Sequence, residues 1–103
     1  MPETTQAQNI MAFDFGTKKM GMAVGQALIE SATPLALFPM KDGIPQWENL
    51  LKIIKQHQPQ LFLVGLPLNM DDSESELSTR ARKFAKRLRH QSNIHTLMVD
   101  ERL

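Results

Sequence analysis

The 103-residue sequence contains no cysteine and no tyrosine. Because the chain has no cysteine, it cannot form a disulfide or a thiolate zinc site and cannot use a cysteine nucleophile. Aromatic residues make up only 6% of the chain, which does not suggest a platform for stacking the bases of a single strand. No apolar run approaches the roughly 18 residues of a membrane-spanning helix, and the polar start, MPETTQAQ, has no features of a signal peptide. These absences predict a cytoplasmic protein with no membrane partner.

The residues that are present have the composition of an ordinary globular domain, but their charge is unevenly distributed. The length predicts a single domain, which we place over 9–103. The polar residues 1–8 are expected to form a flexible N-terminus. The net charge is only +1, yet six of the twelve basic residues fall within ten positions that contain no acid. We call these six residues the basic stripe: Arg80, Arg82, Lys83, Lys86, Arg87 and Arg89.

The order of apolar segments predicts a mixed α/β fold. A helix is expected from Pro45, at the first helical turn, to the stop at Gln58-Pro59. A second helix is expected after a capping box of Ser73 with Glu76, its buried face formed by Leu77, Ala81, Phe84, Ala85 and Leu88. Strands are expected at 9–15, 20–24, within 33–39, at 61–64 and at 94–99. This β-β-β-α-β-α-β order predicts a ribonuclease H-like mixed sheet of five strands that lacks the usual C-terminal helix.

Acidic residues follow two of the expected central strands. Asp14 lies near the end of the first strand, and Asp100 and Glu101 lie at the end of the last. If those strands are neighbours, their carboxylates converge at one edge of the sheet, where ligands of such sheets gather. Oxygen ligands of this kind suit Mg²⁺ or Mn²⁺, which can support phosphodiester hydrolysis. The alternative is that Asp14 is an ordinary turn or capping residue.

The basic stripe predicts contact with a phosphate backbone. Like charges repeat at helical spacing without an acid between them, and binding to nucleic acid relieves that repulsion and releases counterions. The alternative is a solvated outer face of an amphipathic helix. Lys18 and Lys19, in the turn after the first strand, either hold a substrate phosphate or are solvated turn residues.

Three segments together resemble one family, the YqgF family. They are AFDFGTKKMGMAVG (12–25), VGLPLNMD (64–71) with TRARKFAKRL (79–88), and VDERL (99–103). Members of that family are ribonuclease H-like proteins described as Holliday-junction resolvases and as pre-16S ribosomal RNA nucleases. The resemblance covers residues from about 10 to 103 in matching order.

The resemblance implies a metal-dependent endonuclease that processes the 5′ end of pre-16S ribosomal RNA. It assigns catalytic roles to Asp14 and Glu101 with Asp100 beside them, metal binding to Asp14 and Glu101, and a loop near the site to Gly65, Pro67 and Asn69. Family members continue into a further helix with another catalytic Asp, so the resemblance implies an incomplete site within these 103 residues. We also expect a structured nucleic-acid partner, either pre-rRNA or branched DNA, and a monomer or weak homodimer.

Three other functions remain open at this point. The first is cleavage of four-way DNA junctions, which a stable dimer favours. The second is nucleic-acid binding without catalysis. The third follows from Asp-x-Gly-Thr at 14–17, which also occurs in the phosphate loops of actin-like ATPases and sugar kinases, although those proteins need two lobes.

Overall fold

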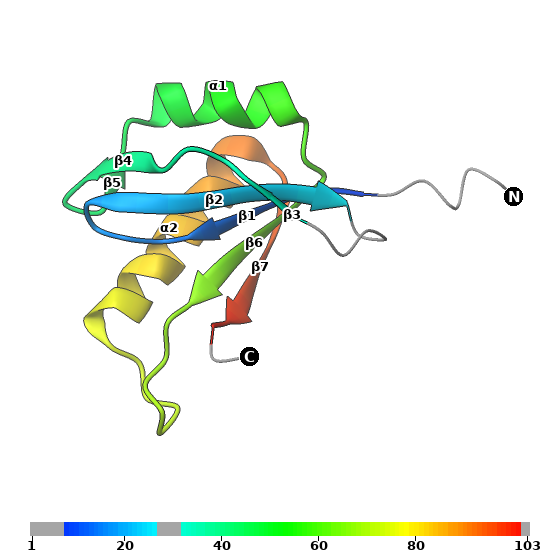
Figure 1. Cartoon of the computed structure of the whole chain (residues 1–103). Helices are drawn as coiled ribbons and strands as arrows, with labels where there is room; N and C mark the ends of the chain where they lie inside the picture. Colours follow the sequence, from blue (N-terminus) through cyan, green and yellow to red (C-terminus); the bar gives the residue numbers. More distant parts are fainter. Residues whose placement is uncertain (1–7, 27–31, 102–103) are drawn as a thin grey trace, which may run out of the picture.

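The structure, a computed structural model, describes residues 8–26 and 32–101, so the N-terminal segment expected to be flexible lies outside it except for Gln8. Within these residues the chain forms seven strands and two helices (Figure 1). They are β1 (Asn9–Asp14), β2 (Lys19–Gln26), β3 (Ala32–Pro34), β4 (Phe38–Lys41), β5 (Ile44–Pro45), α1 (Trp47–His57), β6 (Leu61–Leu66), α2 (Glu76–Ser92) and β7 (His95–Asp100). Neither helix is both long and apolar enough to cross a bilayer.

The strands form one mixed sheet in the order β5-β4-β2-β1-β6-β7, with β3 also paired to β2. β1 is antiparallel to β2 and parallel to β6, and β6 is parallel to β7. The mixed sheet was predicted correctly, but the prediction of five strands was wrong. The strand expected within 33–39 is divided into β3 and β4, and a short hairpin adds β5 through a turn with positive φ at Asp42 and Gly43.

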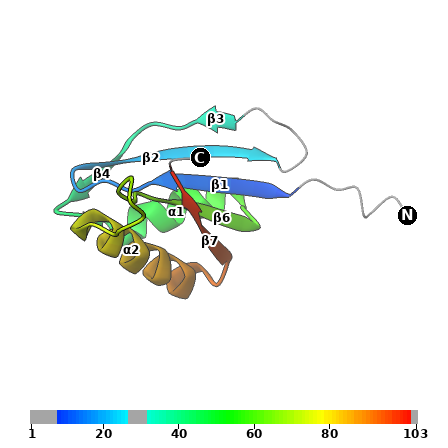
Figure 2. The ribbon, with the colours of Figure 1, turned by 90° about the horizontal axis from the view of Figure 1, so that it is seen from below.

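One face of the sheet carries the hydrophobic core and both helices. Alternate side chains of the central strands, including Met11, Phe13 and Phe62, are buried with the apolar faces of α1 and α2. The ring of Phe13 lies 5.4 Å from that of Phe62 and 5.7 Å from that of Phe84 on α2. Figure 2 shows α2 beside the strands on this side. Because side chains alternate along a strand, the intervening residues must face the other way.

That opposite face is formed largely by small and aliphatic residues. Pairing aligns Ala12 with Ala23 on β2 and with Leu63 on β6, and aligns Leu63 with Leu97 on β7. No helix of the described residues covers this row, since both belong to the core on the other side. We call it the open face.

The helices begin later than the sequence suggested. Pro45 pairs with Met40 in β5, and Gln46 caps α1 by accepting the backbone N–H of Asn49 at 3.0 Å. The expected first-turn role of Pro45 was therefore wrong. The helix ends as predicted near Gln58, which takes a left-handed conformation.

The capping box of α2 was also assigned to the wrong residues. Ser75 is the N-cap and exchanges hydrogen bonds with Ser78, not Ser73 with Glu76. Ser73 is instead held in the preceding loop, where its backbone N–H donates to Asp71 at 3.0 Å. The helix consequently starts at Glu76, and Leu77, expected in the buried face, is 36% exposed. Ser78 takes a place in that face and donates to the carbonyl of Pro67.

Candidate functional site

Two of the acids predicted from the sequence come together at one edge of the sheet. Asp14 ends β1, and Glu101 directly follows the last residue of β7. β6 lies between these strands and is parallel to both, so the three carboxyl ends meet on the same side of the molecule (Figure 1). The backbone N–H of Glu101 donates to the carbonyl of Leu66 at 3.2 Å, which holds Glu101 beside the end of β6.

Two glycines leave room for these carboxyl groups on the open face. A Cβ atom on Gly65 would lie 2.9 Å from Cγ of Glu101 and closer still to Oε1, so the Glu101 side chain occupies the space above that glycine. Gly21 pairs with Asp14, and its Cβ would lie 3.3 Å from Cβ of Asp14. The sequence suggested that Gly65 belongs to a loop near the site, but it lies within β6. Gly21 was not predicted, although an isolated glycine within a strand can mark such a close approach.

The carboxyl group of Glu101 has an unusual proton affinity. Burial, a hydrogen bond with Asp14, and the negative charges of Asp14 and Asp100 raise the pKa of Glu101 from 4.5 to about 7, burial being the largest cause. The carboxyl groups of Asp14 and Glu101 are close enough to share a hydrogen bond, and they repel each other when both are ionised. A proton relieves that repulsion near neutral pH, and a cation can relieve it in the same way.

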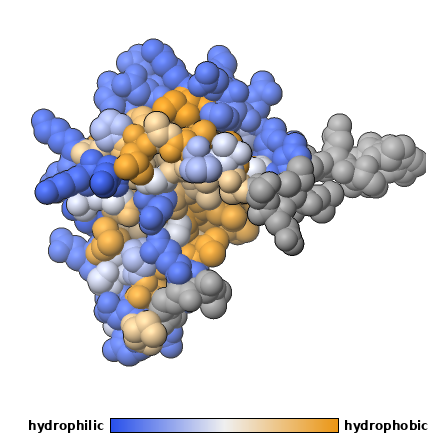
Figure 3. Space-filling model, viewed as in Figure 1, coloured by the Kyte–Doolittle hydropathy of each residue, from blue (hydrophilic) through white to orange (hydrophobic). Residues whose placement is uncertain are grey.

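The two acids line a shallow hollow of about 620 Å³ on the open face. Its other walls are mostly small or apolar residues: Ala12, Phe13, Gly21, Met22, Ala23, Leu63, Gly65 and Val99. Figure 3 shows apolar side chains gathered across the middle of the molecule, where Figure 1 has strands in front. The carboxyl pair is thus accessible from outside while its surroundings are poor in competing polar groups.

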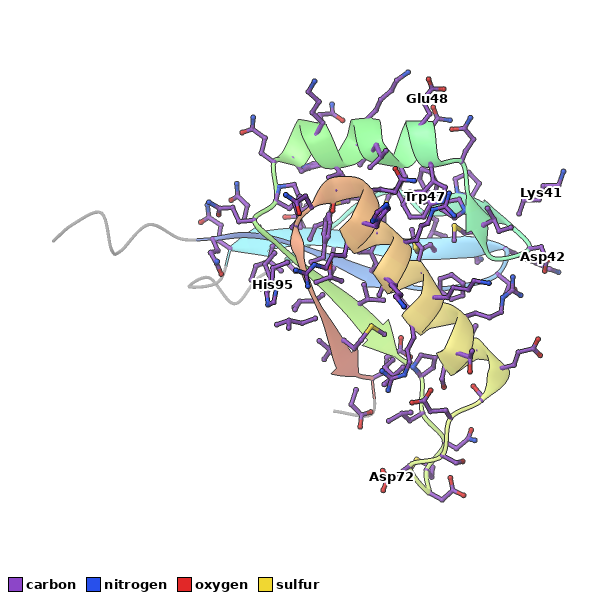
Figure 4. All side chains as sticks on the ribbon, turned by 180° about the vertical axis from the view of Figure 1, so that it is seen from behind. Lys41, Asp42, Trp47, Glu48, Asp72 and His95 are labelled. Atoms are coloured by element: carbon purple, nitrogen blue, oxygen red, sulfur yellow. The ribbon has the colours of Figure 1, made fainter. Side chains whose placement is uncertain are left out.

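The other residues predicted near the site have different positions. Asp100 is on the alternate side of β7 and does not line the hollow, although its charge acts on Glu101. Asn69 donates to Oγ of Ser73 at 2.9 Å, and Pro67 accepts from Ser78, so both belong to the loop that leads into α2. That loop extends away from the body, with Asp72 near its tip (Figure 4).

The basic stripe lies on α2, which packs on the face of the sheet opposite to the hollow. The structure also supplies acids that the sequence did not suggest for it. Arg80 pairs with Asp42 at 3.5 Å, and Arg82 pairs with Glu74 at 2.7 Å. A hydrogen bond with Arg82 lowers the pKa of Glu74. Lys18, in the turn between β1 and β2, and Lys19, the first residue of β2, are both exposed and lie close in sequence to Asp14.

Within the described residues, no group of three or more histidine, cysteine, aspartate or glutamate side chains could hold a metal ion. Among the described residues, the acids that line the hollow are Asp14 and Glu101. This is compatible with Mg²⁺, which is commonly held by one or two carboxylates and keeps several waters.

Comparisons with known proteins show the family to which the chain belongs. The family model described as RuvX, Holliday junction resolvase, matches residues 8–103. A protein of Acinetobacter baylyi is 78% identical over the whole chain, which spans 70% of that relative. A protein of Marinobacter nauticus is 49% identical over 93% of the chain and 67% of the relative. Both are named for a proposed pre-16S rRNA nuclease activity.

A solved structure shows the same fold. The RuvC chain of T. thermophilus, determined with a Holliday junction substrate, superposes with a TM-score of 0.62 over 92% of this chain and 66% of its own length. At 12% identity this likeness concerns the fold alone. The resemblance to the YqgF family is confirmed, and the chain belongs to the RuvX family, also called YqgF.

Proposed function

We propose that this chain carries the Asp14–Glu101 part of a metal-dependent endonuclease that cleaves structured RNA, with the precursor of 16S ribosomal RNA as its substrate. The observation that carries the proposal is the meeting of these two carboxyl groups above Gly65, at the carboxyl ends of three parallel strands. The names of the relatives supply the substrate. The chain spans about 70% of the first of them, so activity of the whole protein is part of the proposal.

The donor set fits Mg²⁺ or Mn²⁺. Both ions prefer carboxylate oxygens, and Asp14 and Glu101 offer them at a position where two negative charges need compensation. When bound, such an ion supplies an activated water and stabilises the leaving oxygen of a phosphodiester. We assign Asp100 an electrostatic role, because its charge acts on Glu101 from outside the hollow.

The chain's own residues have three tasks in this proposal. Asp14 and Glu101 bind the ion and, because the pKa of Glu101 is about 7, release a proton to do so near neutral pH. Lys18 and Lys19 contact the backbone beside the site, and the basic stripe attracts more distant phosphates. Gly65 and Gly21 leave room on the sheet for the side chains of Glu101 and Asp14. This activity belongs in the cytoplasm, where ribosomal RNA is made in bacteria.

The test is cleavage of a pre-16S RNA in the presence of Mn²⁺ or Mg²⁺. We expect Asp14→Asn and Glu101→Gln to abolish cleavage while RNA binding is retained, and Glu48→Gln, an exposed acid on α1 (Figure 4), to leave cleavage unchanged. Because the chain is shorter than its relatives, each variant is made in this chain and in the 78% identical relative. Cleavage that survives both substitutions in the longer protein would refute the proposed site.

Cleavage of a four-way DNA junction is a second candidate. The description of the matching family model and the RuvC-like fold favour it. Resolving a junction needs two coordinated cuts and therefore a stable dimer, whereas RNA processing is compatible with a monomer or weak homodimer. Supplying both substrates in one assay, with the oligomeric state measured by sedimentation, separates the two functions.

A further inference from the structure

A basic groove lies on the helical side of the molecule, apart from the carboxyl pair. It has a volume of about 860 Å³ and runs between α2 and the junction of β5 with α1. Four residues of the basic stripe line it: Arg80, Lys83, Lys86 and Arg87. Trp47 lies at the start of α1 next to α2 (Figure 4), and its ring stacks on Phe84 of α2 at 5.7 Å. The two other stripe residues, Arg82 and Arg89, are not among its lining residues.

The aromatic floor of the groove supports its cations. The guanidinium carbon of Arg87 lies 5.7 Å from the centre of the Trp47 ring, an arrangement that favours the cation and restricts its motion. Phe84 also contacts Phe15 at 5.5 Å. Since Trp47 is stacked on one neighbour and covered by another, its ring is poorly placed to stack a nucleic-acid base. The groove therefore offers positioned positive charge.

These charges lack sufficient acids of their own. Glu76 is the one carboxylate among the groove's lining residues, and Arg80 pairs with Asp42 outside it. Within residues 8–26 and 32–101, Lys83, Lys86 and Arg87 form no ion pair. They are three and four positions apart on one helix, where like charges repel. A polyanion in the groove relieves this repulsion.

The observations favour phosphates over an acidic protein segment. A protein partner usually buries an apolar centre, but Phe15 and Phe84 are each only 5% exposed and offer it little surface. Among the lining residues, Ile44, at 61% exposure, is the one large apolar side chain that is largely exposed. A phosphate backbone needs cations and no apolar floor.

The groove is also connected to the edge that carries the carboxyl pair. The carbonyl of Thr17, in the turn between β1 and β2, accepts the backbone N–H of Gly43 at 2.8 Å. The neighbouring carbonyl of Asp42 accepts a hydrogen bond from Arg80 on the groove's rim. A path along the surface therefore leads from Asp14 to the groove on the other side of the sheet. It passes over the turn between β1 and β2 and then over the turn at Asp42 and Gly43.

We propose that this groove is a second phosphate-binding site, which holds a segment of the nucleic-acid substrate that flanks the cleaved bond. The inference rests on the proposed nuclease function for the identity of the polyanion. Of the six residues of the basic stripe, this proposal assigns phosphate contact to the four that line the groove, and it assigns none to Arg82 and Arg89. The substrate must then extend far enough from the cleaved bond to pass around the end of the sheet.

The test compares two charge-matched double variants by binding in EDTA, where no cleavage occurs. Lys83→Gln with Lys86→Gln removes two charges from the groove, and Lys52→Gln with Lys55→Gln removes two from exposed positions on α1 outside it. The probe is a labelled RNA hairpin with a single-stranded extension, titrated at several salt concentrations. We expect the groove variant to bind about 10-fold more weakly or worse and to lower the log–log salt slope by about 2, with little change in the control.

Three outcomes overturn the inference. Equal weakening by both variants means that only net charge matters. Unchanged RNA binding by the groove variant means that RNA does not use the groove, and loss of binding to a labelled poly-glutamate peptide in that variant then identifies an acidic protein as the ligand. If the wild type and both variants bind the hairpin equally well with and without its single-stranded extension, the groove does not hold a segment that flanks the cleaved bond. Because these measurements need no metal or cleavage, failure of the proposed nuclease activity leaves them interpretable.

Discussion

Removing the charge of Glu101 should stabilise the fold at alkaline pH. Because the pKa of Glu101 is raised from 4.5 to about 7, the folded protein holds this proton over a range in which the unfolded chain has lost it. Stability contributed by the protonated form is complete below pH 4.5 and is lost as the pH rises through 7. Above that pH Glu101 is ionised in the folded state and is repelled by the negative charge of Asp14.

The magnitude follows from the change in proton affinity. A rise of this size corresponds to at most roughly 3 kcal/mol. Glu101 as a whole residue is exposed and its carboxyl group is only partly buried, so solvent screening reduces the value to about 1–2 kcal/mol. For a domain of this length, about 1 kcal/mol shifts the melting temperature by roughly 4–8 °C. We therefore expect Glu101→Gln to raise the melting temperature by about 5–10 °C at pH 8 and to have little effect at pH 4.

The assay is thermal unfolding followed by circular dichroism in EDTA, for wild type and Glu101→Gln at both pH values. Glu48→Gln, exposed on α1, serves as the matched control for loss of one acid. Added Mg²⁺ should narrow the difference at pH 8, because an ion bound only to the folded wild type stabilises it. If Glu101→Gln changes the melting temperature equally at pH 4 and pH 8, the carboxyl pair does not carry the repulsion inferred from the structure.

Two further predictions concern the site and the start of α2. Gly65→Ala introduces a Cβ atom 2.9 Å from Cγ of Glu101, so it should displace that side chain and reduce metal-dependent cleavage about 100-fold. The melting temperature should change little, because the Glu101 side chain can turn toward solvent. Undiminished cleavage would contradict this account. Ser75→Ala should cost about 1 kcal/mol, the usual value of an N-cap, and speed amide exchange at Ser78, whose N–H it caps. Ser73→Ala should leave that amide protected; the opposite pattern would restore the capping box first predicted.

Local sequence signals were sufficient where a short segment decides its own structure. Alternation and apolar runs located the central strands, and the helical spacing of Ala81, Phe84, Ala85 and Leu88 identified most of the face by which α2 packs. The signals failed where neighbouring segments compete. Ser73 and Ser75 are both acceptable caps, and the bond of Ser73 with Asp71 in the loop decides between them.

The candidate site was predictable in part for a similar reason. Parallel strands bring their carboxyl ends to one edge, so the approach of Asp14 to Glu101 could be expected from the order of elements. The role of Gly21 could not, because it depends on the register of β2 against β1. The division of the basic stripe also depends on packing, since the partners of Arg80 and Arg82 come from other segments.

By itself the sequence determined the mixed α/β class, the family and the residue types available for chemistry, because these follow from local periodicity and from motifs carried along the chain. Only the tertiary structure decided that Glu101 lies above Gly65 against Asp14, and that the basic groove faces away from this pair. The physical reason is that such relations depend on strand register and on the face to which each side chain points. A shift of one residue in the register of a strand would move its side chains to the opposite face of the sheet.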